Sequence, residues 1–420
     1  GTCVLFLYFG TVLATPAAGK LVSVLGSKWA TLSSALLFIC ALPFIGMNPR
    51  VNFSYDEAQT RALLSATMFW FGFMLGMMDV AMNACGVVAE IVENRPLMGS
   101  FHGSYSIAAA IAAFVGSSLS AIGWTPLKVF IVVCVVCLFT SLVAGSGLYK
   151  VMSEDKYMSL KNTQTYDAIN TEGGSDDMDA KVLNLQPDDN ETEESIGDTS
   201  CSTWLRDFFP NSATLFLCAV GFLASYGEGG MVTWSVIYYE RYMEVSDTFN
   251  SLGYITFMVC MACGRFACDS LREKFGRRKL VRGGGLLACG GMLLVVFSSI
   301  MPVAIAFCTL GLMLTGAGLS TLIPTVFSSA GHLPNQDTGK AIATVAAFTY
   351  SGSILSPPMI GAMSTAFDSL RLSFLVVSFI FAPLMLLSFG VPHEIVKQYA
   401  QDDLTEEERE SGMRDSLINE

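Results

Sequence analysis

Long apolar runs separated by short polar breaks dominate the sequence. Five of these runs precede residue 150 and six follow residue 206. Most approach or exceed 20 residues, the length that an α-helix needs to cross about 30 Å of hydrocarbon. The pattern therefore predicts an all-α integral membrane protein with eleven spans. The predicted spans are 2–19, 29–47, 61–90, 98–123, 127–149, 211–239, 248–270, 280–300, 302–330, 340–365 and 371–391.

A polar segment at residues 150–206 divides the apolar runs into two groups. It holds acidic residues such as Asp176, Asp188 and Glu193 among Ser, Thr, Asn and Gly, with few large apolar side chains. Such a composition cannot bury enough apolar surface to offset the entropy lost on ordering, so it predicts a disordered linker. The predicted organisation is an N-terminal transmembrane half at 1–149, the acidic linker at 150–206, a C-terminal transmembrane half at 207–392 and an acidic tail at 393–420.

The overall composition supports the membrane class. Hydrophobic residues make up 52% of the chain and charged residues 14%, whereas soluble domains carry about 25% charged residues. A net charge of −12 argues against a nucleic-acid partner. Most of the 12 cysteines lie inside apolar runs without a nearby histidine, so we interpret them as packing residues. We expect no metal or cofactor, and no catalytic constellation that would indicate an enzyme.

Basic residues in one short turn predict the orientation. The turn between the second and third spans of the later half should be cytoplasmic, because short cytoplasmic loops carry an excess of Lys and Arg. Alternation from this turn places the linker, the C-terminus and the turn at Gly19–Lys28 on the same side. The loop at 48–60, with the glycosylation triplet Asn52-Phe53-Ser54, then lies outside. The basic residues of the turn are Arg272, Lys274, Arg277, Arg278, Lys279 and Arg282.

Two segments repeat one pattern, at Gly19–Lys28 and at Asp269–Arg278. Each has a small or polar residue, an acid or its substitute four positions later, glycine seven positions later, and then basic residues. The repeat resembles the loop signature between helices two and three, and eight and nine, of major facilitator superfamily transporters, although Ser23 replaces the usual acid and Asp269 the first glycine. The resemblance implies a helical bundle of two pseudo-equivalent halves, in which this chain begins at the family's second helix and lacks the first.

Asp79, Asn83 and Glu90 form the first candidate constellation. Ionisable residues inside membrane helices cost about 2.5–3.5 kcal/mol on insertion scales, so each is a functional candidate. Asp79 and Asn83 stand at i and i+4, on one helix face. We expect Asp79 to couple transport to protons; the alternative is a structural hydrogen-bonding role. Glu90 lies three turns further on, near Arg95, and we interpret it as part of a structural or gating ion pair.

A second resemblance concerns the same region. It rests on Met78–Asn83, Glu90, Arg95–Met98 and Ser100–His102. These residues are similar to a bacterial inner-membrane branch of the superfamily, distantly akin to the fucose–proton symporter group. In that group the fourth-helix acid implicated in proton coupling matches Asp79, and a second acid lies on the first helix. By resemblance His102 falls near a sugar-contacting glutamine; the alternative is a histidine at an interfacial helix end.

Glu228 and its surroundings form the other constellation. Glycines flank this acid in Tyr226–Gly230, and glycines in membrane helices permit unwinding or close approach beside a cavity. The same bacterial branch shows a similar acid–glycine–tryptophan–serine pattern on its seventh helix. We therefore expect Glu228 to take part in proton coupling, and the aromatic residues to bind the solute together with Asn83 and His102; for Trp234 the alternative is an interfacial anchor. The aromatic residues are Tyr226, Trp234 and Tyr238.

These observations predict a secondary active transporter working by alternating access. The expected cargo is a small polar organic solute, with a sugar as one option, and the expected partners are protons and the lipid bilayer around a monomer. The alternatives are proton-driven efflux of an amphipathic compound, and a transporter-like receptor or scaffold that signals through the linker and tail. Conformation-dependent ion pairs at the cytoplasmic gate are expected from Glu90, Arg95, Arg265, Asp269, Glu273 and Lys274.

Overall fold

The structure, a computed structural model, describes residues 2–47, 56–93, 95–147, 212–243, 252–333 and 336–392. Within these ranges the chain is almost entirely helical and contains no strand. The predicted linker at 150–206, the predicted tail at 393–420 and the triplet at Asn52 lie outside the described residues. The predictions made for those segments therefore remain predictions.

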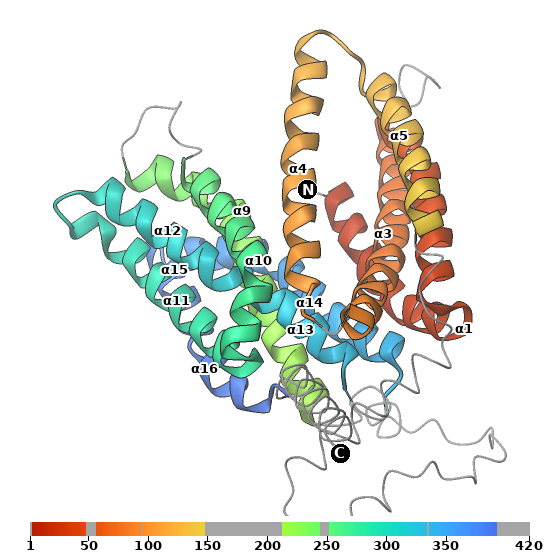
Figure 1. Ribbon diagram of the computed structural model, residues 1–420. Coiled ribbons are helices and arrows are strands. Elements are labelled where there is room, and N and C mark those ends of the chain that lie inside the picture. The colour runs from red at the N-terminus through yellow and green to blue at the C-terminus, as the bar shows by residue number, and fades with distance from the viewer. Residues whose placement is uncertain are drawn as a thin grey trace, which may run out of the picture.

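Among the described residues, four helices build the first half of the bundle, as can be followed in Figure 1. Two of the predicted spans lie within α1, which is interrupted at Gly26 by backbone angles of φ 75° and ψ 157°. A positive φ is accessible to glycine at little steric cost. The chain stays helical on both sides of Gly26, so the turn is much shorter than the ten-residue segment predicted at Gly19–Lys28. The helices are α1 (Thr2–Gly46), α3 (Glu57–Glu93), α4 (Met98–Ala121) and α5 (Pro126–Gly147).

The second half follows the segment that is not described. Its fourth predicted span is divided between α12 and α13, which meet at Thr321. Its last predicted span is divided between α15 and α16. The helices of this half are α9 (Ser212–Tyr242), α10 (Leu252–Phe275), α11 (Arg277–Phe297), α12 (Ala304–Ser320), α13 (Leu322–Gly331), α14 (Thr338–Ala366), α15 (Leu370–Phe381) and α16 (Pro383–Leu387).

Eight helical segments of the described chain are long and apolar enough to cross a membrane. They begin with Leu5–Gly46 and end with Leu370–Gly390. The prediction of an all-α membrane fold is therefore confirmed. The count of eleven spans stays a prediction, because α1 holds two predicted spans in one helix and α4 and α14 are not among the eight.

The two halves contact each other at one end of the bundle, which we call the closed end. It comprises the last turns of α3 and α10, the first turns of α4 and α14, and the Gly19 region of α1. A Cβ added at Gly19 would lie 2.9 Å from the Cβ of Ala343 on α14, so these helices approach closely. Beyond its first turns α4 exposes Tyr105, Ile107 and Ile111. Figure 1 shows α4 and α9 diverging towards the opposite end.

Candidate functional site

Asp79 and Asn83 share a face of α3, as the spacing predicts. The Asn83 side-chain amide donates to the Asp79 carbonyl oxygen at 2.9 Å and to Asp79 Oδ2 at 3.0 Å. A third group, which the sequence analysis did not single out, joins them from the other half: the Tyr350 hydroxyl on α14 donates to Asp79 Oδ2. Asp79 is half-buried. The carboxylate therefore accepts one hydrogen bond from its own helix and one from across the two halves.

Glu228 and Arg265 form an ion pair in the second half. Arg265 NH2 lies 3.0 Å from Glu228 Oε1 and 3.1 Å from Oε2. The Glu228 side chain retains 23% of its exposure, whereas that of Arg265 retains 6%. Arg265 NH1 also donates to Ser106 Oγ on α4 at 2.7 Å, which links the pair to the first half. Arg265 was predicted to act at a gate with Asp269. In this arrangement its guanidinium bonds to Glu228, and a conformation-dependent role of Arg265 at the gate stays a prediction.

His102 lies on α4, four residues before Ser106, between the two halves. Its ring stacks on Phe327 of α13 with centroids 6.0 Å apart and planes 17° apart. Its Nε2 is buried and has no hydrogen-bond partner among the described residues. An imidazole nitrogen can donate or accept a hydrogen bond according to its protonation. His102 can therefore offer one further polar contact to a bound molecule.

One face of α10 carries three charged side chains towards the first half. Arg265, Asp269 and Arg272 stand at i, i+4 and i+7, which places them on one helical face. Each contacts a residue of the first half: Ser106, Ser100 and Glu90 respectively. The helix thus presents positive, negative and positive groups in succession from the middle of the bundle to its closed end.

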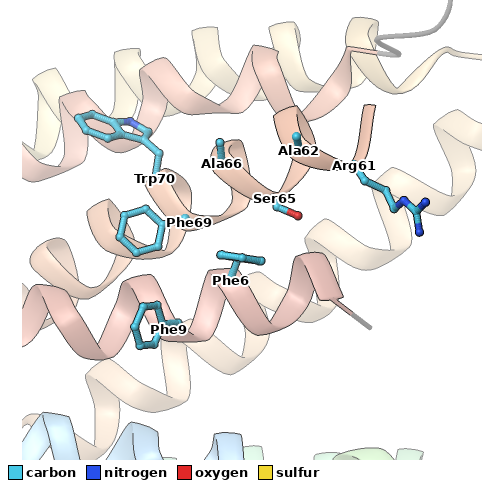
Figure 2. A pocket seen from close by; sticks show the side chains of 8 residues that line it. All are labelled: Phe6, Phe9, Arg61, Ala62, Ser65, Ala66, Phe69 and Trp70. Carbon is cyan, nitrogen blue, oxygen red and sulfur yellow. The ribbon is translucent and has the colours of Figure 1, made fainter. Parts of the chain in front are cut away.

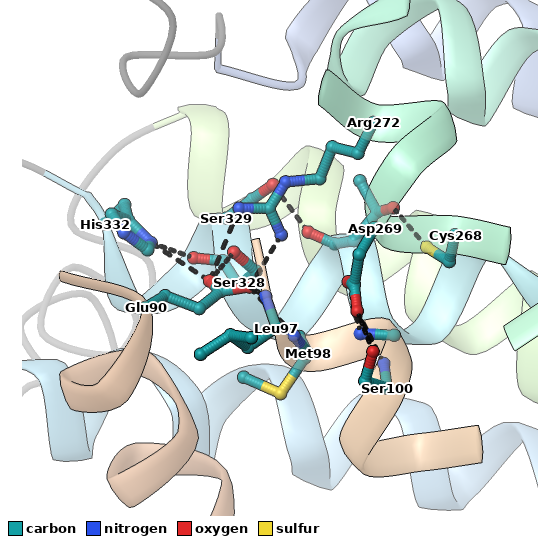
Figure 3. A network of polar contacts seen from close by, with 12 residues as sticks. Glu90, Leu97, Met98, Ser100, Cys268, Asp269, Arg272, Ser328, Ser329 and His332 are labelled. Atoms are coloured by element: carbon teal, nitrogen blue, oxygen red, sulfur yellow. Dashed lines mark hydrogen bonds and ion pairs between the residues drawn. The ribbon is translucent and has the colours of Figure 1, made fainter. Parts of the chain in front are cut away.

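Glu90 is the centre of the closed-end network shown in Figure 3. Its carboxylate lies 2.9 Å from Arg272 NH1, and the two side chains are 0% and 1% exposed. Glu90 Oε1 also accepts the backbone N–H groups of Leu97 and Met98 at the start of α4, both at 2.9 Å. Ser328 on α13 donates its hydroxyl to Oε2. One buried carboxylate therefore joins four helices from both halves.

His332 borders the same network, immediately after α13. Its Nδ1 lies 2.7 Å from the Ser328 carbonyl oxygen and 3.9 Å from Glu90 Oε2. Burial, followed by the nearby Arg277 guanidinium, lowers the pKa of His332 to about 3. The imidazole is therefore neutral in this arrangement at neutral pH.

Asp269 binds the N-terminus of α4. Its carboxylate accepts the backbone N–H of Gly99 at 2.8 Å, the backbone N–H of Ser100 at 2.7 Å and the Ser100 hydroxyl at 2.5 Å. The first N–H groups of a helix have no partner inside the helix, and a carboxylate there is also favoured by the helix dipole. Because α4 and α10 belong to different halves, this contact closes the bundle at this end.

The remaining predicted gate residues lie at the surface. Arg95 was expected near Glu90, and its backbone N–H donates to the Glu90 carbonyl oxygen at 3.2 Å, but its guanidinium lies 3.9 Å from the exposed Glu93. The ion-pair partner of Glu90 is therefore not Arg95. The Glu90 carboxylate points into the bundle and pairs with Arg272, which the sequence predicted to be a loop charge. Glu273 and Lys274 are exposed near the end of α10, and the Lys274 ammonium lies 5.4 Å from the centre of the Phe275 ring.

The aromatic residues predicted to bind solute lie within the second half. Tyr238 is fully buried, stacks on Phe374 at 4.8 Å and donates its hydroxyl to the Val295 carbonyl at 3.0 Å. Tyr226 is also buried, and Trp234 donates its indole N–H to the Pro357 carbonyl at 3.2 Å. These contacts are internal to one half. The role of Tyr226, Trp234 and Tyr238 in solute binding therefore stays a prediction.

An apolar pocket of about 620 Å³ lies apart from these polar groups (Figure 2). It is formed by α1 and α3 of the first half, and none of the predicted site residues lines it. The lining residues are Phe6, Phe9, Arg61, Ala62, Ser65, Ala66, Phe69 and Trp70.

Comparison with known proteins gives the family. The family model described as Major Facilitator Superfamily matches residues 1–330 and 217–410. An uncharacterised transporter of Sinorhizobium fredii, y4wD, is 27% identical over 385 residues, covering 92% of this chain and 86% of the relative. An uncharacterised MFS-type transporter of Yersinia pestis is 25% identical over 387 residues, covering 90% and 84%.

Solved structures share the fold. FucP, a Major Facilitator Superfamily transporter in the outward conformation, has a TM-score of 0.67 at 17% identity, covering 94% of this chain and 90% of that one. The proton:xylose symporter XylE has a TM-score of 0.67 at 14% identity, covering 95% and 88%.

Proposed function

We propose that this chain, which belongs to the Major Facilitator Superfamily, carries a small polar organic solute across a membrane together with protons. Transporters of this kind expose a midplane site to each side in turn by rocking one half against the other. The observation that carries the proposal is the position of Asp79, an ionisable group midway along α3 that is hydrogen-bonded to Asn83 and to Tyr350 of the opposite half.

Asp79 is well suited to binding and releasing a proton. An ionised carboxylate is costly inside a membrane bundle unless partners offset its desolvation. Here its two hydrogen-bond donors come from different halves, so its surroundings must change when the halves move. A carboxylate whose environment alternates can take up a proton in one conformation and release it in the other. Glu228 is the second proposed proton site, since its carboxylate is paired with Arg265, which also bonds to Ser106 of the first half.

The polar groups between the halves favour a hydrophilic solute. Asn83 and His102 supply hydrogen-bonding groups beside Asp79 and the Glu228–Arg265 pair, and His102 Nε2 has no partner among the described residues. Two structural neighbours, FucP and XylE, are a fucose:proton symporter and a proton:xylose symporter. This supports a sugar or a similarly polar molecule as the cargo.

We propose that the closed end is cytoplasmic. The exposed Lys274 lies there at the end of α10, as do the basic residues Arg278 and Lys279 at the start of α11. Short cytoplasmic loops are enriched in Lys and Arg. The structure then corresponds to a transporter that is closed to the cytoplasm. We further propose that the protein works as a monomer.

The test is uptake by full-length protein in proteoliposomes, using a panel of sugars and other polar solutes under an imposed pH gradient. Asp79→Asn should abolish gradient-driven accumulation while solute exchange continues, because exchange needs no net proton movement. The matched control is Glu57→Gln, an acid-to-amide change in the same helix at an exposed position. Accumulation that survives Asp79→Asn would refute proton coupling at this residue.

The panel also separates the two alternatives. A pH gradient that drives amphipathic compounds out, with no uptake of polar solutes, would favour efflux. A chain that transports nothing but loses a binding partner when residues 155–200 are deleted would favour a receptor or scaffold.

A further inference from the structure

We infer that Tyr350 is a positioning residue: through its hydrogen bond, the charge state of Asp79 in one half of the bundle affects how firmly the other half is held against it. The inference rests on the proposed proton coupling at Asp79. Tyr350 lies on α14 in the second half, and its hydroxyl donates to Asp79 Oδ2 on α3 in the first. The two residues are 271 positions apart in the chain, so the bond exists only because the halves meet.

The Asp79–Tyr350 bond lies deeper in the bundle than the other cross-half contacts of the charged groups. Asp79 precedes the end of α3 at Glu93 by 14 residues, and Tyr350 follows the start of α14 at Thr338 by 12. At 1.5 Å per residue these positions are roughly 18–21 Å from the closed end. Glu90 and Arg272, by contrast, are within about a turn of their helix ends. The Asp79–Tyr350 bond therefore lies further from the closed end than the Glu90–Arg272 pair, beside the proposed solute-binding residue Asn83.

The strength of this bond depends on the charge of Asp79. A hydrogen bond to an ionised carboxylate is roughly twice as strong as one between neutral groups. A proton on Asp79 removes the charge and weakens the bond to Tyr350. Asn83 lies on the same helix as Asp79, so its hydrogen bond does not join the halves. Protonation therefore weakens the Tyr350–Asp79 hydrogen bond between the halves, whereas the Asn83–Asp79 bond within α3 does not hold the halves together.

Tyr105 on α4 is a further titratable group that faces Asp79. Tyr105 of α4 interacts electrostatically with Asp79, Glu228, Arg265 and Tyr8 of α1. Among the described residues, however, the side chains that donate hydrogen bonds to the Asp79 carboxylate are those of Asn83 and Tyr350. An ionised Asp79 should therefore favour the closed end through Tyr350, and a protonated one should permit it to open.

Hydrogen exchange reports this opening without a known solute. The backbone N–H groups of Gly99 and Ser100 donate to Asp269 across the halves. Those of Leu97 and Met98 donate to Glu90, which is itself paired with Arg272 of the second half. Exchange at 97–100 should therefore rise when the closed end opens. At pH 7.5, Asp79→Asn and Tyr350→Phe should each increase exchange at 97–100 about tenfold. The double variant should exchange no faster than either single one, because both remove the same charge-assisted bond.

A matched control separates this role from a structural one. Tyr239→Phe removes a tyrosine hydroxyl bond to Thr309, but both residues belong to the second half. It should leave exchange at 97–100 unchanged. Unchanged exchange in α11 and α12 would show that Tyr350→Phe is folded.

Two results would overturn the role of Tyr350 without bearing on proton coupling at Asp79. Additive effects of Asp79→Asn and Tyr350→Phe would overturn the inference, as would an effect of Tyr350→Phe no larger than that of Tyr239→Phe. Both results leave the proposed proton coupling intact. That coupling fails separately, if Asp79→Asn retains gradient-driven accumulation in proteoliposomes.

Discussion

Glu90 and Arg272 form a buried ion pair between the two halves, 2.9 Å apart and 182 positions distant in the chain. Removing one partner from a buried pair leaves an uncompensated charge and costs about 3–5 kcal/mol. In this bundle the cost falls on the closed arrangement, because separating the halves would let water solvate the remaining charge. The pair therefore stabilises the closed arrangement of the two halves.

Glu90→Gln should destabilise the closed arrangement. Glutamine keeps the approximate shape of the side chain but removes its charge, leaving Arg272 buried without its anionic partner. We expect hydrogen exchange at residues 97–100 to rise at least tenfold, since the Leu97 and Met98 N–H groups also lose their carboxylate acceptor. The measurement is hydrogen exchange by mass spectrometry on full-length protein at pH 7.5.

The matched control for Glu90→Gln is Glu93→Gln, three residues further along α3. Glu93 pairs with Arg95 at 3.9 Å, and both side chains are more than half exposed. Exposed pairs contribute little to stability, so exchange should not change measurably. Similar effects of the two substitutions would argue against a specific role for Glu90.

The sequence was sufficient to predict an all-α membrane fold, but the pairing across the halves was not predictable from it. Apolar runs and polar breaks predicted the membrane fold, and i, i+4 spacing predicted the contact between Asp79 and Asn83. Both depend on local chain geometry. The partners of Glu90 and Arg265 depend instead on how two helix groups, far apart in the chain, dock against each other.

Arg272 and Tyr350, the partners of Glu90 and Asp79 from the second half, were not predicted, each for its own reason. Arg272 lies in a cluster of basic residues, and the positive-inside rule treats such residues as loop charges. Its position seven residues after Arg265 was the available signal, since this spacing returns to the same helix face. Tyr350 is a polar group in an apolar run, but tyrosines also occur at membrane interfaces, so its identity alone did not indicate a partner.

Gly99→Ala should loosen the contact between α4 and α10. An added Cβ would lie 2.7 Å from the Arg265 carbonyl oxygen, from Asp269 Oδ1 and from Cys268 Cβ. Overpacking of this kind costs about 1–3 kcal/mol. Because the clash lies between the halves, we expect at least a fivefold rise in exchange at the N-terminus of α4.

Gly116→Ala on the same helix is the control. An added Cβ there would have no atom within 4 Å among the described residues. Exchange at 97–100 should stay at its original value in this variant. If Gly99→Ala also leaves it unchanged, the close approach of α4 and α10 does not limit opening.

His332 should make the closed end sensitive to acid. The groups facing it are Glu90 of α3, Arg272 of α10 and Arg277 of α11. Burial, and then Arg277, lower its pKa to about 3 in the closed arrangement, whereas an exposed histidine has a pKa near 6.5. The open arrangement therefore binds more protons between these values. The closed end should be fully stable above about pH 6.5 and lose stability as the pH falls below it.

The expected size follows from the two pKa values. Between pH 7.5 and 5.5 the ratio of closed to open protein should fall about tenfold. Measuring it in an Asp79→Asn background removes the proposed coupling group, and exchange at 97–100 is corrected for its intrinsic pH dependence. Adding His332→Gln should abolish the tenfold change, because glutamine can still donate to the Ser328 carbonyl but does not titrate. An unaltered pH response in the His332→Gln protein would assign the acid sensitivity to another group.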